Sequence, residues 1–380
     1  MADYYGRTYS SPSGRRKNQR STVGLLVDIA MGIVTLCVVA LFIATLMVPT
    51  LDPREWGWVS TLGLVAPFVY AAQALLTLYW IVRWRVVVAS LMLIISLCGI
   101  AQLSHFYKLE MRRVYTEPNL RPRYDSRALK VLSYNVRSFI DDNGERCIDS
   151  IISMIKTINP DIVCLQEMGF SDIVDSLLEP LRPMPRSLSR VDLSPAIYSR
   201  YPIIRAGRID SLKEFVWADI VVKRGTTEDT LRIFNNHLHT MSISANDSQD
   251  IEQGRILQDG DRMRSIANRI ASNSSIRASY VDTLRTVVAE TPYDNIICGD
   301  FNDTPMSYVY GELIKGHKDA FVECGSGYGY TFRPMHRTLR IDYVLYSDGM
   351  EVQKYEVDPE ATLSDHLPVK ATIKLRNKKK

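Results

Sequence analysis

The segment Ile296–Asp303 places an acid and an amide two residues apart, directly after a short apolar run. The run ends at Gly299, and Asp300 and Asn302 follow it. Residues i and i+2 of an extended segment point to the same side, so both side chains should face one cleft from the end of a buried strand. A carboxylate there can accept a proton from water, and an amide can donate to an anion. Taken alone, the segment could equally be an ordinary turn.

Five other apolar runs also begin or end at polar groups. These groups are Asn135, Glu167, the pair His237 and His239, Asp342, and the pair Asp365 and His366. One polar strand end is common in any protein. Six ends drawn from Asn, Glu, His and Asp instead suggest a shared site at one edge of a sheet core.

The elements that must position these groups lie in residues 128–380, which have the texture of a soluble α/β domain. Strand-like runs are expected at 128–134, 161–165, 195–198, 215–222, 231–236, 295–298, 341–346 and 369–375. Helical patterns fall between them, at 147–157, 262–270, 280–289 and 308–314. No internal repeat of fixed period is visible.

The first third of the chain is different in character. Residues 1–22 are polar and rich in Ser, Tyr and Arg, which predicts a disordered basic tail. Residues 23–107 carry three apolar stretches, at about 23–49, 60–82 and 86–106, which predict three transmembrane helices. A signal peptide is the alternative for the first stretch, and a buried helical domain is the alternative for all three. Residues 108–127 are charged, contain two prolines and are predicted to be a linker.

Basic residues predict the orientation of these helices. The tail is rich in Arg and Lys, and Arg83 and Arg85 lie between the second and third stretches. The positive-inside rule then puts the amino terminus in the cytoplasm, and an odd number of spans puts residues 128–380 outside it. Four arginines at 112, 113, 121 and 123 favour the opposite orientation.

Composition limits the classes of function. The net charge of +4 comes partly from the two ends of the chain and does not indicate a surface that coats nucleic acid. The six cysteines show no metal-ligand spacing, so we expect neither a disulfide framework nor a zinc site. No protein partner is evident from the sequence.

The ordered set of polar strand ends resembles the endonuclease/exonuclease/phosphatase (DNase I-like) superfamily. The matching pieces, in order, are Ser133-Tyr134-Asn135-Val136, Leu165-Gln166-Glu167, Asn236-His237-Leu238, Gly299-Asp300-Phe301-Asn302, Arg340-Ile341-Asp342-Tyr343 and Ser364-Asp365-His366-Leu367-Pro368. The resemblance covers the domain from about Leu129 onward and none of the apolar helices. It implies an α/β fold, a four-layered sandwich of two packed β-sheets flanked by helices.

The resemblance also implies roles for individual residues. Glu167, Asn135 and Asp365 would hold Mg²⁺, with Mn²⁺ as an alternative, because such ions prefer oxygen ligands and keep room for substrate. The catalytic residues would be His237, Asp300, Asn302, Asp342 and His366, with Asp300 deprotonating water and Asp342 holding a cationic His366. Asn135, Arg137 and Asn302 would contact the substrate phosphate.

Two points in this assignment stay open. His239 lies on the same face of its strand as His237, so either could be the active histidine, and a His-x-His metal pair is a further alternative. Arg137 stands where some nucleases of the superfamily carry an acid, which puts a two-metal arrangement in doubt.

We therefore expect a membrane-anchored, Mg²⁺-dependent phosphoesterase that hydrolyses phosphodiester bonds, as nucleases do, by in-line attack of water. The alternatives are a lipid-headgroup phosphodiesterase, a phosphomonoesterase, and a catalytically inactive binding module on a membrane anchor. The expected partners are a phosphoester substrate, either nucleic acid or lipid headgroup, and the lipid bilayer.

Overall fold

The computed structural model describes residues 22–109, 128–169, 171–184, 195–209, 212–224 and 227–376. The predicted basic tail, apart from Thr22, lies outside the described residues. So does the predicted linker from residue 110 onward.

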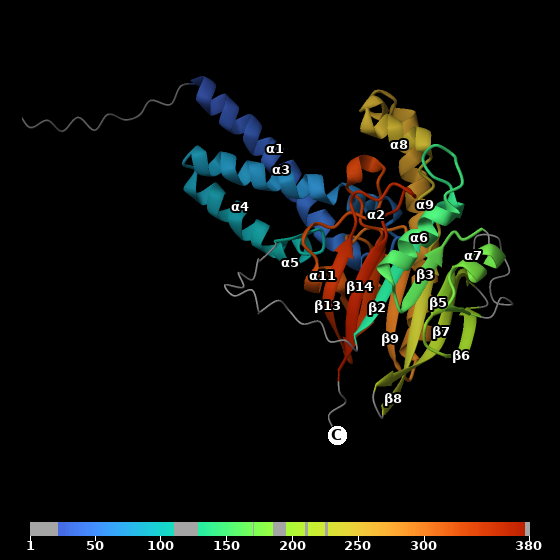
Figure 1. Cartoon of the computed structure of the whole chain (residues 1–380). Coiled ribbons are helices and arrows are strands. Elements are labelled where there is room, and N and C mark those ends of the chain that lie inside the picture. Colours follow the sequence, from blue (N-terminus) through green and yellow to red (C-terminus); the bar gives the residue numbers. More distant parts are fainter. Residues whose placement is uncertain are drawn as a thin grey trace, which may run out of the picture.

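Two six-stranded sheets form the centre of the domain (Figure 1). The first has the order β13 (Met350–Val357), β14 (Val369–Leu375), β2 (Leu129–Asn135), β3 (Ile162–Gln166), β5 (Ala196–Ser199) and β4 (Arg182–Pro183). The second has the order β10 (His317–Asp319), β12 (Asp342–Ser347), β9 (Asp294–Asp300), β8 (Thr227–His237), β7 (Leu212–Arg224) and β6 (Ile203–Ile209). Each sheet has one parallel pair at its centre, β2–β3 and β8–β9.

The two sheets pack face to face because alternate residues of their central strands are apolar. Val131, Cys164, Ile233, Cys298 and Val344 all belong to one buried cluster shared by both sheets. The side chains between them point outward and are covered by helices. The predicted fold of two packed sheets flanked by helices is confirmed.

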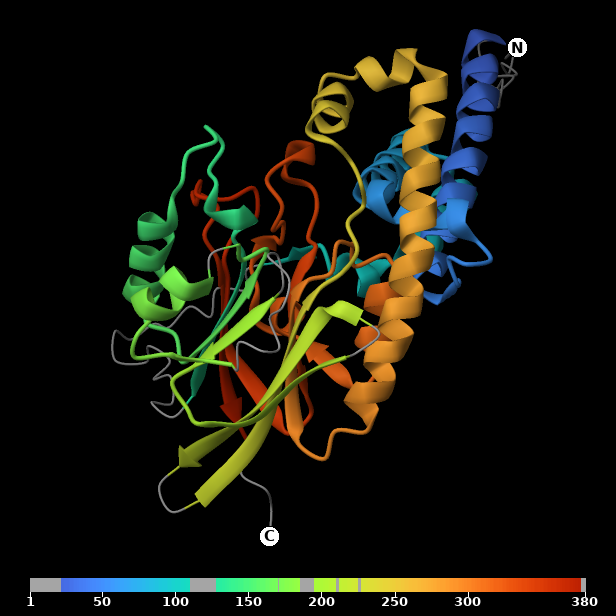
Figure 2. The ribbon, with the colours of Figure 1, turned by 90° about the vertical axis from the view of Figure 1, so that its right-hand side faces the viewer.

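Helices complete the outer layers of the sandwich (Figure 2). The first sheet is covered by α6 (Ile148–Ile158) and α7 (Ser171–Leu177), and the second by α9 (Gly260–Ala289) and α10 (Tyr308–Leu313). Short helices α8 (Ala245–Glu252) and α11 (Ala320–Cys324) lie in the connections. The two helices predicted at 262–270 and 280–289 are in fact one continuous helix, and strands β6 and β13 were not predicted.

The prediction of three membrane-spanning helices is wrong in its third member. The first two apolar stretches form α1 (Thr22–Met47) and α3 (Leu62–Val82), which are long enough and apolar enough to cross a membrane. The third breaks at Gly99 into α4 (Val86–Cys98) and α5 (Ile100–Leu103). At 1.5 Å per residue, α4 is only about 20 Å long, which is shorter than a bilayer core of about 30 Å.

The apolar helices α1, α3 and α4 pack together and project from the sandwich (Figure 1). At their far end, the Asp28 carboxylate pairs with Arg83 and Arg85 in the α3–α4 turn. Their near end docks on the domain, where a short helix, α2 (Gly57–Ser60), lies against α9. There β1 (Tyr107–Lys108) also pairs with β11 (Gly327–Tyr328) of the domain. Among the described residues, the helices and the sandwich therefore form one packed body.

Candidate active site

The site lies where the layer between the two sheets changes from apolar to polar. The inward-facing positions of β2, β8 and β9 are apolar at one end and carry Asn135, His237 and Asp300 at the other. Just beneath them Gln166 Nε2 donates to Asn235 Oδ1 at 2.6 Å, which ties the two sheets together. The period-two alternation of strands thus places the polar groups in one layer.

Strand register brings Asp300 to the middle of this layer. Asp300 lies directly opposite His237 of β8 on one side and Asp342 of β12 on the other. The preceding residue must be glycine, because a Cβ on Gly299 would lie 1.9 Å from Asn236 O, and its φ of 132° is unfavourable for other residues.

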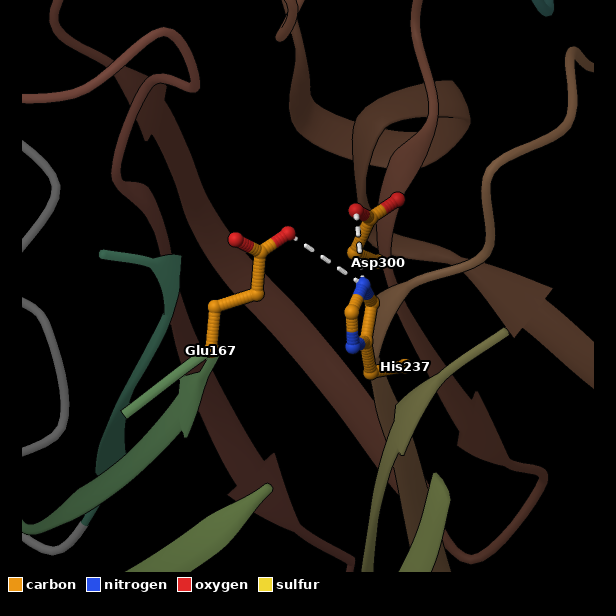
Figure 3. A group of neighbouring side chains, drawn as sticks. All are labelled: Glu167, His237 and Asp300. Atoms are coloured by element: carbon orange, nitrogen blue, oxygen red, sulfur yellow. Dashed lines mark ion pairs between the residues drawn. The ribbon is translucent and has the colours of Figure 1, made fainter. Parts of the chain in front are cut away.

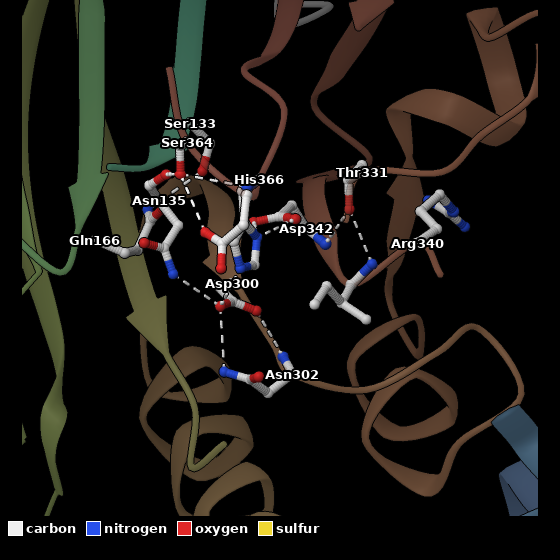
Figure 4. A network of polar contacts seen from close by, with 12 residues as sticks. Ser133, Asn135, Gln166, Asp300, Asn302, Thr331, Arg340, Asp342, Ser364 and His366 are labelled. Atoms are coloured by element: carbon white, nitrogen blue, oxygen red, sulfur yellow. Dashed lines mark hydrogen bonds and ion pairs between the residues drawn. The ribbon is translucent and has the colours of Figure 1, made fainter. Parts of the chain in front are cut away.

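The Asp300 carboxylate is buried, and amide groups fix its orientation (Figure 4). The backbone N–H of Asn302 donates to Asp300 Oδ1 at 2.8 Å, and Asn302 Nδ2 lies 3.2 Å from Asp300 Oδ2. Asn135 Nδ2 also donates to Asp300 Oδ2, at 3.1 Å. Asn302 Nδ2 further donates to Leu238 O at 2.9 Å, so in this structure Asn302 serves to hold Asp300. Its role as a phosphate ligand stays a prediction.

His366 and Asp342 form a buried pair beside Asp300. His366 Nδ1 lies 3.0 Å from Asp342 Oδ2, and His366 Nε2 lies 3.6 Å from Asp300 Oδ2. Burial alone lowers the pKa of His366, but the carboxylates of Asp342 and Asp300 outweigh it and raise that pKa to about 10. A pKa this high favours the imidazolium form of His366 at neutral pH, and the role of that cation in catalysis stays a prediction.

Glu167 and His237 form the more exposed side of the site. Figure 3 shows both side chains together with Asp300. His237 Nε2 lies 3.4 Å from Glu167 Oε1 and 3.9 Å from Asp300 Oδ2. Burial raises the pKa of Glu167, but hydrogen bonds from His237 and Asn135 together with the charge on His237 bring it down to about 2. The pKa of His237 is depressed by burial and raised overall by Glu167 and Asp300. Both side chains are partly exposed, at 29% and 18%, and so can meet a ligand.

Backbone strain marks two of these positions. Glu167 and Asn302 both adopt left-handed conformations, with φ of 52° and 48°. For glutamate such a conformation costs about 1 to 2 kcal/mol, whereas asparagine adopts it more readily. Strain of this kind persists where the surrounding structure holds a functional side chain in place.

The donor set fits a divalent cation. Ligand atoms of Glu167, His237 and Asp300 lie within 4.8 Å of one another, and those of Asp300, Asp342 and His366 form a second such group. Three carboxylates converge here, and Mg²⁺ is commonly bound by one or two carboxylates plus waters. Glu167, the carboxylate with open space beside it, is the residue that would hold the ion.

The other two predicted metal ligands are placed differently. Asn135 Nδ2 donates to Glu167 Oε1 at 2.9 Å, so the amide nitrogen and not the oxygen faces Glu167. The oxygen, Asn135 Oδ1, accepts from Arg137 N at 3.0 Å. Asp365 lies beside Arg137, with 3.8 Å between Asp365 Oδ2 and Arg137 Nε, and belongs to neither group of potential ligands among the described residues. Their metal-binding roles stay predictions.

A groove of about 530 Å³ adjoins the site. Its wall combines cations, acids and apolar groups, among them Arg137, Asp142, Ile243, Phe332, Arg333, Arg337 and Asp365. Arg137 lines this groove, and its contact with substrate stays a prediction. Arg340 is instead buried and paired with Asp319 at 2.7 Å.

The structure separates the two candidate histidines. His237 belongs to the first group of potential ligands, and His239 belongs to neither group among the residues described. The backbone oxygen of His239 instead accepts from Arg277 Nη1 at 3.1 Å.

Three residues that support the site were not predicted from the sequence. Thr331 Oγ1 accepts the backbone N–H groups of Ile341 and Asp342, both at 3.0 Å, and so anchors the start of β12. The Phe332 ring lies 5.0 Å from the His366 ring, and Ser364 Oγ donates to Asn135 O at 2.8 Å. Ser364 lay within a recognised motif, whereas Thr331 and Phe332 come from a loop with no local signal.

The domain is thus a sandwich of two packed sheets with a cluster of acids and histidines at one edge. The family model described as the endonuclease/exonuclease/phosphatase family matches residues 132–366, and the chain belongs to that family. Membership indicates a hydrolase that acts on phosphoester bonds. A second model, a domain of unknown function (DUF8431), matches residues 28–106. No curated protein sequence matches the chain.

Solved structures with a similar fold include three proteins of distant sequence. An endonuclease/exonuclease/phosphatase from Bacteroides vulgatus has 19% identity and a TM-score of 0.47, covering 66% of this chain and 99% of its own. The catalytic domain of human nocturnin, solved with a sulfate anion, has 17% identity and a TM-score of 0.43, covering 65% and 93%. Truncated TDP2 from Caenorhabditis elegans has 18% identity and a TM-score of 0.45, covering 65% and 97%.

Proposed function

We propose that this chain is a membrane-anchored, Mg²⁺-dependent hydrolase of phosphodiester bonds. The observation that carries the proposal is the buried row of Asp342, His366 and Asp300, in which the His366 ring lies between two carboxylates. Phe332, whose ring lies 5.0 Å from that of His366, lines the neighbouring groove. A cation that stabilises phosphoryl oxygens and a base that activates water are the two protein groups that such hydrolysis needs.

Each residue then has a definite task. Asp300, held by Asn302 and Asn135, accepts the proton of the attacking water. His366, oriented by Asp342, donates a hydrogen bond to a phosphoryl oxygen. Glu167 would hold the Mg²⁺, which would neutralise charge at the phosphate when bound. Arg137 contacts substrate from the groove wall.

The test uses the full chain in phospholipid vesicles, with bis-p-nitrophenyl phosphate and p-nitrophenyl phosphate as substrates. Activity is measured with Mg²⁺, with Mn²⁺ and with EDTA, in wild type, Asp300→Asn and a control, Asp348→Asn. Asp348 is exposed just past the opposite end of β12, about 20 Å from the site at 3.3 Å per residue. Removing a general base typically costs about 10² to 10⁴-fold in rate.

We expect metal-dependent diester cleavage that Asp300→Asn abolishes and Asp348→Asn leaves intact. Preference for the monoester would move the assignment to a phosphatase. No turnover of either substrate, or equal turnover in wild type and Asp300→Asn, would contradict the proposal. The first of these results would favour the binding module.

Membrane anchoring is supported by the surfaces of α1 and α3. Only 17% and 33% of the residues in their most apolar windows are buried in the protein, so their outer faces need another apolar environment. Trp56 and Trp58 are exposed in the connection near the domain, where tryptophans favour a bilayer interface.

We also propose that the domain lies outside the cytoplasm, which requires α4 and α5 together to return the chain to the side of the membrane on which α1 ends. The turn between α3 and α4, which carries Arg83 and Arg85, lies at the opposite end of the apolar helices from the domain (Figure 1). The positive-inside rule assigns that end to the cytoplasm. Activity of a cytoplasm-specific reporter fused after Lys380 would contradict this orientation.

A lipid-headgroup phosphodiester is a second candidate substrate, favoured by one contact. Leu64 in the first turn of α3 packs against the same buried cluster as Ile243 and Phe332, which line the groove. The groove therefore lies next to the end of a candidate membrane span. Release of headgroups from vesicles, compared with cleavage of a soluble oligonucleotide, separates the two substrate classes.

A further inference from the structure

The loop between β9 and α10 holds the Asp300 carboxylate. It runs from Phe301 to Ser307, and Asn302 in its first turn donates two hydrogen bonds to Asp300. Its middle is tied to the second sheet, since Tyr343 OH donates to Asp303 O at 2.8 Å. Any shift of this loop therefore moves the base that the proposed reaction uses.

The far end of the same loop contacts the first turn of α3. Thr304 Oγ1 donates to Gly63 O at 3.1 Å, although these residues are 241 positions apart in the sequence. The backbones approach so closely that a Cβ on Gly63 would lie 2.2 Å from Met306 O. Met306 is fully buried in one cluster with Ala66 and Phe106.

The Gly63 carbonyl is available to Thr304 because of a proline one turn later. In an α-helix the carbonyl of residue 63 normally accepts the N–H of residue 67. Residue 67 is Pro67, inside α3, which has no N–H and whose ring crowds the carbonyl four residues earlier. Thr304 is buried at 2% exposure and supplies the donor that the helix lacks.

We propose that Thr304 is a positioning residue, through which the first turn of α3 fixes the loop that orients Asp300. Pro67 and Gly63 make this contact possible on the side of α3. Pro67 leaves the Gly63 carbonyl without a helical donor, and Gly63 has no side chain to block the close approach of the loop. The apolar helices are then part of the active site's support as well as an anchor. This role rests on the proposed hydrolase function, which uses Asp300 as the base.

Other contacts also hold the apolar helices on the domain, so the Thr304–Gly63 hydrogen bond can be removed without undocking the helices. Arg340 Nε donates to His105 O at 3.0 Å, Arg54 Nη2 pairs with Asp282 at 2.7 Å, and Ser275 Oγ donates to Pro53 O at 2.9 Å. Loss of the Thr304 hydroxyl should therefore leave the helices docked while it releases the catalytic loop.

The test is a double-mutant cycle in the full chain in vesicles, with thermal unfolding and hydrolysis of bis-p-nitrophenyl phosphate as separate readouts. Thr304→Val leaves the buried Gly63 carbonyl without a donor, which lowers Tm. Pro67→Ala returns an N–H to the helix, so the double variant recovers Tm. The kcat of Thr304→Val should fall at least about tenfold with KM unchanged, because small misplacements of a catalytic group are costly.

The decisive result is the double variant, in which Tm recovers and kcat stays low. Thr304→Ser keeps the donor and should restore both quantities. The control Thr45→Val removes a buried hydroxyl that donates to Phe42 O within α1, and should leave kcat unchanged.

Wild-type kcat in Thr304→Val, or recovery of kcat together with Tm in the double variant, would overturn the positioning role. Failure of Pro67→Ala to rescue Tm would overturn the account of the carbonyl. Absence of turnover in the wild type would instead refute the proposed function, and the Tm cycle would still test the hydrogen bond by itself.

Discussion

Asp342→Asn tests the electrostatics of the site most directly, because it removes one charge and keeps the shape. The asparagine oxygen can still accept from His366 Nδ1, which lies 3.0 Å from Asp342 Oδ2. What disappears is the carboxylate that contributes most to raising the pKa of His366 to about 10. Asp300 still faces His366 Nε2 at 3.6 Å, so the pKa should fall from about 10 toward the ordinary value of about 6.5.

The size of the effect follows from the fraction of protonated His366. With a pKa of about 10, essentially all molecules carry the imidazolium at pH 7.5. A pKa lowered to about 6.5 would leave only about one molecule in ten protonated, so the rate at pH 7.5 should drop by up to about tenfold.

The assay is the pH profile of kcat with bis-p-nitrophenyl phosphate between pH 5.5 and 9. The variant should regain activity as the pH is lowered toward 6.5, whereas the wild type should show no loss from His366 deprotonation up to about pH 9. A variant profile parallel to that of the wild type would show that the charge on His366 is not set by Asp342. The reasoning would then be refuted, even if the overall rate were lower.

Two further predictions concern stability. Gly63→Ala should destabilise the chain by about 1 to 3 kcal/mol, since its Cβ would meet Met306 O at 2.2 Å, whereas Gly32→Ala, with nothing within 4 Å, should be neutral or stabilising in thermal unfolding. In EDTA, the stabilisation from His366 should be fully present below pH 6.5 and be lost as the pH rises through about 10, because its folded pKa lies above its unfolded pKa. The difference in Tm between wild type and His366→Gln should shrink over that range, and a difference that grows would contradict the prediction.

The polar strand ends were predictable because each is a local pattern. An apolar run that stops at Asn135, Glu167 or Asp300 predicts a strand and the polar side chain at its end. The alternation of side chains along a strand then predicts which face of the sheet that side chain lies on. The pairing of Asp342 with His366 came only from the family resemblance. No spacing in the sequence brings residue 342 to residue 366.

What the sequence could not predict depends on contacts between distant segments. The polar residues 271–279 look like a break between two helices, yet α9 continues through them because Asn273 donates to Ser242 Oγ and Arg277 pairs with Asp303. Likewise the sequence around Pro67 indicates only a kink, whereas the structure shows Thr304 Oγ1 donating to the Gly63 carbonyl one turn earlier. The third apolar stretch was predicted to be one long helix because of its high hydropathy, but the helix ends at Gly99.

Leu64, at the start of α3, packs in the same cluster as groove residues, so the groove lies next to the proposed bilayer. Held this close by a rigid body rather than a flexible tether, the site would sample a thin layer at the membrane surface. A lipid-borne phosphoester would then reach it by lateral diffusion, and turnover would follow the mole fraction of that lipid in the membrane. Dilution with inert lipid at constant total substrate would slow such a reaction, while cleavage of a soluble ester would be indifferent to it.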